Sequence, residues 1–279
     1  MEAQLEKIKE IQRESWNKAS AGWKKWDELM MQFLQPMSDE MINMLRLQED
    51  YEVLDIATGT GEPGLTIASL LKNGKVIATD ISENMLAVAK ANAEKRGLLN
   101  FETKYCEVSE LPFEENTFDA ITCRLGFMFF PDIEIALGEM KRVLKPGGLL
   151  VASVWNRPED NFWVSNSMEI MIRQLQLKSP APGGPGLFRC SSKSFMHDLF
   201  SKAGLNNIKE NDVHGKMPCG TKENYWNFIT EVASPLAFSK ADALQQQQIK
   251  DEVLSRVDKK FPDGNVQLNS SATVICGQK

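Results

Sequence analysis

An acidic residue followed by closely spaced glycines is the stretch of this chain with the clearest chemical meaning. Asp55 lies in a short β-prone run, and Gly59 and Gly61 follow it before a helical apolar pattern begins near Leu65. Because glycine has no Cβ, the backbone of such a turn can approach a ligand closely, at the N-terminus of the helix that follows. The stretch therefore predicts a binding site for a small molecule.

Two cofactor classes fit this stretch. Gly59, Gly61 and Gly64 satisfy the Gly-x-Gly-x-x-Gly pattern of dinucleotide-binding proteins, so a nicotinamide-dependent oxidoreductase is one alternative. Asp55 opposes it, because a pyrophosphate on this turn would meet a carboxylate, and like charges repel. S-adenosylmethionine carries an ammonium and a sulfonium and no phosphate, so an acid followed by glycines favours that cofactor.

A second acidic residue stands where a nucleoside would need it. Residues 75–80 are predicted to form the next strand, and Asp80 ends it. This is about the 20-residue distance at which a nucleotide-binding βαβ unit places an acid on the ribose hydroxyls. Ser82 is better placed than Asp80 to cap the following helix, so the Asp80 carboxylate is expected to meet adenosine.

Residues 51–155 resemble the class I S-adenosylmethionine-dependent methyltransferases. The resemblance lies in the acid and glycines of residues 55–61, the Leu-Pro-Phe segment at 111–113, the Phe-Asp run at 118–119, and Arg-Val-Leu-Lys-Pro-Gly-Gly at 142–148. The ubiquinone/menaquinone-biosynthesis methyltransferases are the most similar subgroup by motif. This resemblance implies a Rossmann-like, doubly wound α/β fold, with a mostly parallel seven-stranded sheet, helices on both faces and, in this chain, an added helical cap.

The resemblance also implies a cofactor site at the ends of the first four strands. Glu107 would accept a hydrogen bond from the adenine amino group, and the Val108 N–H would meet the ring. Ala57 stands where many family members have another glycine. The complete set of expected cofactor-binding residues is Asp55, Ala57, Thr58, Gly59, Gly61, Asp80, Ile81, Met85, Glu107, Val108, Arg124 and Leu125.

The methyl acceptor is expected to be small and largely apolar or aromatic, and to be methylated at O or N. In the quinone C-methyltransferases the loop after the fourth strand carries Gly-hydrophobic-Arg-Asn, whereas here Met128 and Phe129 replace the polar pair. A C-methyltransferase of quinone type remains an alternative, as does a methyltransferase fold that binds the cofactor but acts as a partner or acts on a protein. The expected acceptor-binding residues are Trp16, Trp23, Phe127, Met128, Phe129, Trp163, Tyr225 and Trp226.

His214 is the candidate general base. A hydroxyl acceptor must lose a proton, and the chain has only two histidines. His197 lies on a helix that packs behind the sheet in this family. His214 follows the predicted sixth strand, residues 208–213, and could face the cleft, although a surface or packed position is the alternative.

The segments outside the motifs are assigned around this core. Trp16, Trp23 and Trp26 share one face of a predicted helix, which either packs in the core or folds over the cofactor, where an aromatic face could stabilise the sulfonium. The expected organisation is a helical lid at 1–48, the cofactor-binding core at 49–155, a cap insertion at 156–190, a core continuation at 191–214, a second helical cap insertion at 215–267 and the last core strand at 268–279.

Composition limits the partners and the location. The chain has 279 residues and a net charge of −6, so its overall field does not attract nucleic acid. Its first residues lack the apolar segment of a signal peptide, and no apolar run approaches the ~20 residues needed to cross a bilayer. The five cysteines are scattered, with no Cys-x-x-Cys, so no metal site is expected. These features indicate a cytoplasmic enzyme with a small-molecule substrate and with no nucleic-acid or membrane partner. The oligomeric state is left open.

Overall fold

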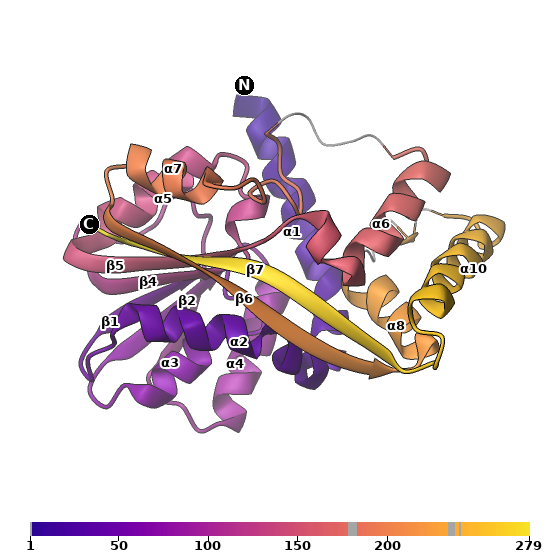
Figure 1. The fold of residues 1–279 in the computed structure, drawn as a ribbon. Helices are drawn as coiled ribbons and strands as arrows, with labels where there is room; N and C mark the ends of the chain where they lie inside the picture. The colour runs from indigo at the N-terminus through magenta and orange to yellow at the C-terminus, as the bar shows by residue number, and fades with distance from the viewer. Residues whose placement is uncertain (1, 178–182, 234–237, 240) are drawn as a thin grey trace.

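A twisted seven-stranded sheet forms the centre of the computed structural model, which describes residues 2–177, 183–233, 238–239 and 241–279 (Figure 1). The strand order is β3-β2-β1-β4-β5-β7-β6. All pairs from β3 to β5 are parallel, and β7 runs antiparallel between β5 and β6. The doubly wound, mostly parallel sheet expected from the sequence is confirmed. The strands are β1 (Glu52–Ile56), β2 (Lys75–Asp80), β3 (Phe101–Tyr105), β4 (Phe118–Arg124), β5 (Leu144–Trp155), β6 (Asn206–Gly220) and β7 (Val266–Gln278).

Helices cover both faces of the sheet, which is why the central strands are apolar on both sides. In Figure 1, α5 and α7 lie above the strands, and α2, α3 and α4 lie below them. Val53, Leu54 and Ile121 in the central strands β1 and β4 are fully buried. These helices are α2 (Asp27–Leu45), α3 (Gly64–Leu70), α4 (Glu83–Lys95), α5 (Ile133–Val143) and α7 (Phe195–Lys202).

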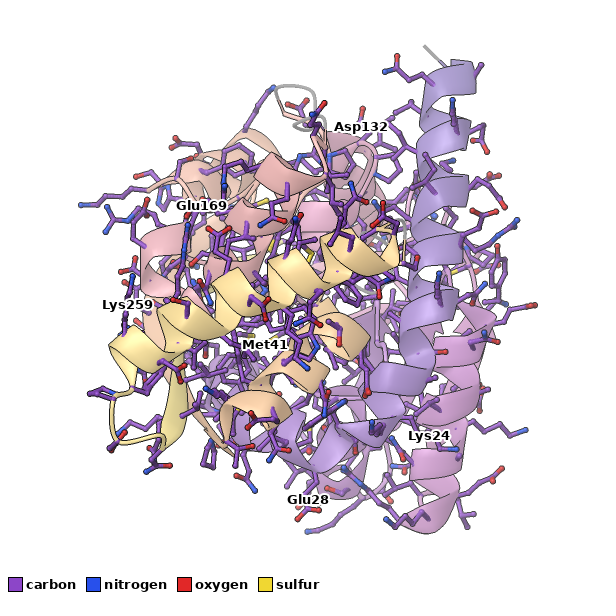
Figure 2. The ribbon with its side chains drawn as sticks, turned by 90° about the vertical axis from the view of Figure 1, so that its right-hand side faces the viewer. Lys24, Glu28, Met41, Asp132, Glu169 and Lys259 are labelled. Carbon is purple, nitrogen blue, oxygen red and sulfur yellow. The ribbon has the colours of Figure 1, made fainter. Side chains whose placement is uncertain are left out.

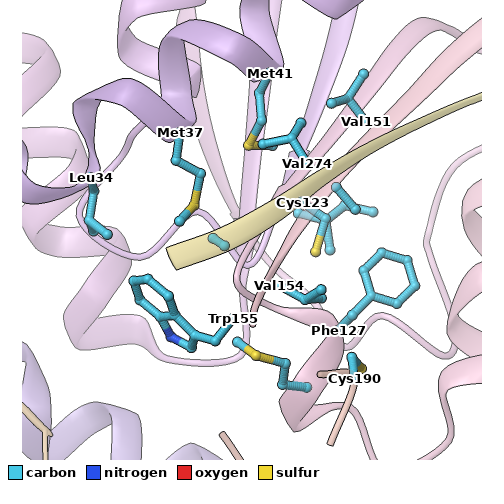
Figure 3. Close-up of a cluster of buried hydrophobic side chains, with 14 of the residues drawn as sticks. Leu34, Met37, Met41, Cys123, Phe127, Val151, Val154, Trp155, Cys190 and Val274 are labelled. Atoms are coloured by element: carbon cyan, nitrogen blue, oxygen red, sulfur yellow. The ribbon is translucent and has the colours of Figure 1, made fainter. Parts of the chain in front are cut away.

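The N-terminal region consists of two helices with different surroundings, α1 (Glu2–Lys25) and α2. Helix α2 packs on β5, β6 and β7, and it buries Phe33, Met37 and Met41 there. Figure 3 shows Met41 beside Val274 of β7. Of the segment 1–48 that the sequence predicts as a lid, α2 is part of the sheet's own core, so only α1 is left as a candidate lid.

A helical lobe lies beside the sheet and consists of α6, α8, η3 and α10 (Figure 1). Viewed from that side, α10 crosses the front of the lobe and α1 stands next to it (Figure 2). Strands β6 and β7 stay paired from His214↔Ser271 out to Gly220↔Val266. The expected cap insertion at 215–267 is therefore shorter, because its first and last residues extend the hairpin. The lobe elements are α6 (Phe162–Gln174), α8 (Lys222–Phe228), the π-helical turn η3 (Ile229–Ala233) and α10 (Ala243–Lys260).

Two short 3-10 turns complete the described elements, η1 (Phe127–Phe129) after β4 and η2 (Pro158–Asp160) after β5. Within the described residues, no helix is both long enough and apolar enough to span a bilayer.

Candidate functional site

A cavity of about 330 Å³ lies at the carboxyl ends of β1, β2 and β4, beneath α1 and against the lobe. Strand order reverses between β1 and β4, and ligands of open α/β sheets bind at such a point. Its polar lining comes from the turn after β1, from the ends of β2 and β4, from the segment after β3 and from α1. Its aromatic lining comes from α1, from the segment after β4, from the end of β5 and from α6.

The turn after β1 has the backbone that its glycines predict. Ala57, Gly59 and Gly61 have positive φ values of 54°, 56° and 115°. A Cβ on Gly61 would lie 2.6 Å from a methyl carbon of Leu65, whereas a Cβ on Gly59 would meet nothing within 4 Å. Gly61 is thus required for the packing of α3, and Gly59 leaves the turn open where it lines the cavity.

Asp80, at the end of β2, lines the cavity and holds the turn at the same time. One carboxylate oxygen accepts a hydrogen bond from the Gly59 N–H at 2.9 Å, and the other accepts from the Ser82 N–H at 2.8 Å. Burial raises the pKa of Asp80 to about 6. Ser82 caps α4 through its hydroxyl, which accepts from the Met85 N–H at 3.1 Å, so the capping role falls to Ser82 as the sequence predicts.

Glu107 lines the cavity at the end that α1 covers. The Lys9 ammonium of α1 lies 3.0 Å from one Glu107 oxygen. The Ser109 hydroxyl donates to the same oxygen, and the Ser109 N–H donates to the other at 3.1 Å. Ile81, Met85 and Val108 also line this end.

Arg124 and Leu125 line the cavity where β4 ends. The Arg124 side chain is buried, with 8% exposed, and its Nη1 donates to the Ser38 hydroxyl of α2 at 3.0 Å. Leu125 has a φ of 62°, and its N–H donates to the Ser153 carbonyl at 3.0 Å.

Aromatic side chains from distant segments form the opposite part of the cavity wall. Trp16 of α1 stands edge-on to Phe129 with ring centroids 5.0 Å apart, and to Trp23 at 6.2 Å. Trp155 and Trp163 lie 5.2 Å apart. Offset and edge-to-face arrangements of this kind are the favoured ones for aromatic pairs, so these rings form a preorganised apolar surface.

Comparison with known proteins supplies the family. The profile of a methyltransferase domain matches residues 53–148. Demethylmenaquinone methyltransferase of Thermus thermophilus is 45% identical over 101 residues, which are 36% of this chain and 44% of that protein. The Bacillus subtilis protein of the same name is 32% identical over 194 residues, which are 63% of this chain and 80% of that protein. The chain belongs to the class I S-adenosylmethionine-dependent methyltransferases.

Within that family the chain falls in the subgroup similar to the ubiquinone/menaquinone-biosynthesis methyltransferases, as its motifs predict. The family and its cofactor, S-adenosylmethionine, are confirmed, and the nicotinamide alternative is not supported. The chain spans about half the length, or less, of the first curated relatives that it matches. A Bacillus halodurans protein of known crystal structure has a TM-score of 0.60 at 22% identity, over 87% of this chain and 98% of that chain, which shows the shared fold.

Most of the expected cofactor residues line the cavity of this methyltransferase, but Asp55 and Gly61 do not. Asp55 is fully buried, and its two oxygens accept hydrogen bonds from the Thr58 and Thr122 hydroxyls, each at 2.6 Å. Burial raises the pKa of Asp55 to about 6. The sequence predicts that Asp55 meets the cationic end of the cofactor. In the structure Asp55 lies beneath the turn, where it holds Thr58 and Thr122 and does not line the cavity.

Of the three expected acceptor residues in this segment, Phe129 lines the cavity, whereas Phe127 and Met128 are buried and do not line it. The three residues form the 3-10 turn η1, in which about three residues make one turn, so successive side chains point in different directions. Phe127 is fully buried and packs on Phe130 and Phe200; Figure 3 shows it in the cluster with Cys123 and Val154.

Tyr225 and Trp226, two further residues expected at the acceptor, belong to the interior of the lobe. The Tyr225 hydroxyl donates to the Trp163 carbonyl at 3.2 Å and accepts from the Asn166 amide at 3.3 Å. Trp226 packs edge-on against Phe238 at 5.1 Å. Both hold the lobe that positions Trp163, the one lobe tryptophan that reaches the cavity.

His214 is not brought to the cavity. It lies within β6, paired with Ser271, and its side chain is exposed. Gly215 and Met217 are buried on the other face of the strand, and strand side chains alternate between faces. His214 therefore points to solvent, and the structure does not support it as the general base. The described residues that line the cavity include no histidine.

Among the aromatic residues that line the cavity, Phe130 and Trp155 are not in the expected set. Trp155 ends β5 at the same edge of the sheet as Asp80 and Arg124. That position is a signal which the sequence carries, because the carboxyl ends of parallel strands meet at one edge.

Proposed function

We propose that the protein transfers a methyl group from S-adenosylmethionine to a small, largely apolar or aromatic acceptor at O or N. The observation that carries the proposal is one cavity in which the family's cofactor-binding turn adjoins a wall of aromatic side chains. The cofactor supplies a methyl group already activated by its sulfonium. The protein's contribution is then chiefly position, which is worth up to ~7–11 kcal/mol for well-aligned reactants.

The cofactor's groups match the residues of the polar lining. The Asp80 carboxylate is suited to the ribose hydroxyls, because carboxylate oxygens accept more than one hydrogen bond each. Glu107 is suited to the adenine amino group and the Val108 N–H to the ring. The rings of Trp16 and Trp23 are suited to a sulfonium, which aromatic faces attract.

The aromatic lining selects the acceptor by shape and buried area. Trp16, Phe129, Trp155 and Trp163 present ring surfaces to the cavity, and burial of apolar surface is worth ~25 cal/mol per Å². An acceptor with a flat, apolar body fits such a lining. Helix α1 would act as its lid and the lobe as its cap.

A second candidate is C-methylation of a quinone-type ring. It is favoured by the name demethylmenaquinone methyltransferase that several relatives carry. It is opposed by Met128, which stands in the place of a polar residue of that group and is fully buried here.

A small-molecule substrate is the proposed partner, with no nucleic acid and no membrane. The acidic net charge of −6 supports this. The cytoplasm is the proposed location, in line with the five cysteines, all of which are free.

A two-stage experiment tests the proposal. Thermal unfolding is first compared with S-adenosylmethionine, S-adenosylhomocysteine, NAD and NADP, because a ligand that binds the native state raises the midpoint. Isotope-labelled S-adenosylmethionine is then incubated with the protein and 1-naphthol, 1-naphthylamine or 1,4-naphthoquinol, and the methylated atom is located by NMR. Stabilisation by NAD alone would refute the cofactor, and a methyl group found only on ring carbon would establish the second candidate.

A further inference from the structure

Arg124 is a buried cation in the cavity wall, and none of the described carboxylates forms an ion pair with it. Its side chain is 8% exposed, and its hydrogen bond in the described structure is the one from Nη1 to the Ser38 hydroxyl. A guanidinium has five N–H donors in a planar fork. Burial lowers the pKa of Arg124, yet arginine stays charged at physiological pH. Buried charges are costly unless they are paired.

The carboxylates that face Arg124 are Asp27 of α2, Asp55 of β1 and Glu62 before α3. Each is engaged with another group. Both Asp55 oxygens accept from threonine hydroxyls, and Glu62 pairs with Arg96 at 2.6 Å. Asp27 accepts from the Thr60 hydroxyl at 3.3 Å. These carboxylates make the electrostatic potential at Arg124 more negative, but none of them forms an ion pair with it in the described structure.

A buried donor, in addition to Arg124, lies in the same cavity wall. The buried indole Nε1 of Trp23 makes no hydrogen bond in the described part of the chain, and Trp23 lines the cavity. An indole N–H and a guanidinium can only donate. The cavity therefore offers donors to its acceptor, and these match an oxygen better than a protonated amine.

The guanidinium is held by the helix that also supports the aromatic lining. Its partner Ser38 belongs to α2, and α2 also places Phe33 against Trp155 and Trp163, with ring centroids 6.0 and 5.3 Å apart. Asp80 and Glu107 stand at the ends of other strands, toward β2 and β3. This placement favours the acceptor over the carboxylate of the cofactor as the missing partner.

We propose that Arg124 binds the oxyanion of the methyl acceptor, and that the acceptor is an aromatic compound with an acidic ring hydroxyl. This inference rests on the proposed function. The hydroxyl proton leaves to solvent when the anion forms. The oxyanion's electron pair then makes the bond to the methyl carbon, while the carbon–sulfur bond breaks and its electrons stay on sulfur. Such an acceptor needs no protein base, which agrees with the solvent-facing position of His214.

A spectroscopic titration tests this assignment on the full chain saturated with S-adenosylhomocysteine. The probe is 4-nitrophenol, whose anion absorbs visible light and whose neutral form does not, with 4-nitroanisole as its neutral methyl ether. We expect the wild-type protein to bind the anion at least tenfold more tightly than the ether, and to lower the pKa of the bound probe by one unit or more.

Variants assign the effect to the guanidinium. Arg124→Met should remove the preference for the anion, and Arg124→Lys should retain part of it. Arg256→Met, which removes a guanidinium that pairs with Glu169 on the lobe surface, should keep the full preference. Ser38→Ala removes the hydroxyl that Arg124 contacts but leaves the charge in place, so it should also keep the preference. If Arg124→Met fails to fold, the partial loss of preference in Arg124→Lys is the test.

Three outcomes would overturn the inference. Wild-type binding of the anion no tighter than that of the ether would do so without any variant. A tenfold loss of S-adenosylhomocysteine affinity in Arg124→Met, with the anion preference intact, would assign the guanidinium to the cofactor's carboxylate. Absence of stabilisation by S-adenosylhomocysteine in thermal unfolding would remove the proposed function itself, and the inference with it.

Discussion

The Asp80 carboxylate and the Gly59 N–H form a hydrogen bond of 2.9 Å that joins the end of β2 to the turn after β1. Asp80 also lines the cavity. One side chain thus holds the turn of Gly59 and also lines the cavity. If the proposed cofactor site is correct, the geometry of this turn and the affinity for S-adenosylmethionine are coupled.

Asp80→Asn is expected to weaken S-adenosylhomocysteine binding by more than tenfold in calorimetry. The amide keeps the volume, but it loses the charge and replaces one acceptor with a donor. The matched control is Asp119→Asn, which breaks the ion pair with Lys145 at the opposite end of β4 and should leave affinity unchanged. Equal affinity in wild type and Asp80→Asn would remove the ribose assignment.

Asp55→Asn is expected to change how stability depends on pH. Burial raises the Asp55 pKa to about 6 in the folded protein, from about 4 in the unfolded chain. Since the folded state then binds the proton more tightly, this group makes the protein less stable as pH rises from about 4 to 6, by about 2 kcal/mol in total. The variant lacks this loss. Urea titrations at pH 4.5 and 7 should therefore show that the unfolding free energy of the variant, relative to that of wild type, is higher at pH 7 than at pH 4.5. A difference that does not vary with pH would contradict the assignment.

Trp16→Ala is expected to raise the acceptor KM about tenfold, equivalent to about 1.4 kcal/mol, with little effect on S-adenosylhomocysteine affinity. Trp16 contacts Phe129 across the cavity wall, and the variant removes part of the ring surface that an aromatic acceptor would cover. Trp226→Phe is the control, because Trp226 lies inside the lobe and does not line the cavity. A KM that rises equally in both variants would indicate a general loss of structure.

Removal of residues 1–20 is expected to abolish turnover while the sheet stays folded. Helix α1 contributes Lys9, Trp16 and Ala19 to the cavity wall, and it is fastened to the core where the Ser82 hydroxyl donates to Asn17 at 2.7 Å. Helix α2 is retained because it packs on the sheet. Circular dichroism and a methyl-transfer assay are the measurements, and full activity in the folded truncated protein would exclude the lid.

His214→Ala is expected to leave kcat and its pH profile within twofold of wild type. The side chain is exposed on the outer face of β6 and does not line the cavity, so it is not placed to accept a proton from the acceptor. A fall of ~10²–10⁴-fold, the usual effect of losing a general base, would show that β6 rearranges during turnover.

The length of β6 explains why the prediction for His214 was wrong. With a strand of residues 208–213, His214 would sit at the strand's end near the cleft. The strand continues to Gly220 because it stays paired with β7, and this pairing sets which face each side chain occupies. A shift of one residue moves a side chain to the other face, and nothing local in the sequence specifies it.

The sequence by itself determined the features that one contiguous segment encodes. The turn of Gly59 and Gly61, the acid at the end of β2 and the Ser82 cap each depend on neighbours within one strand-turn-helix unit, and parallel strands bring their ends to one edge. Tertiary structure alone decided the rest. It buried Asp55 beneath the turn and turned Phe127 into the core while Phe129 faces the cavity. It also left Arg124 without an ion pair to any described residue, although acids of three segments act on it. These outcomes depend on side-chain direction and on contacts between segments far apart in the chain, such as Arg124 with Ser38, and long-range packing fixes both.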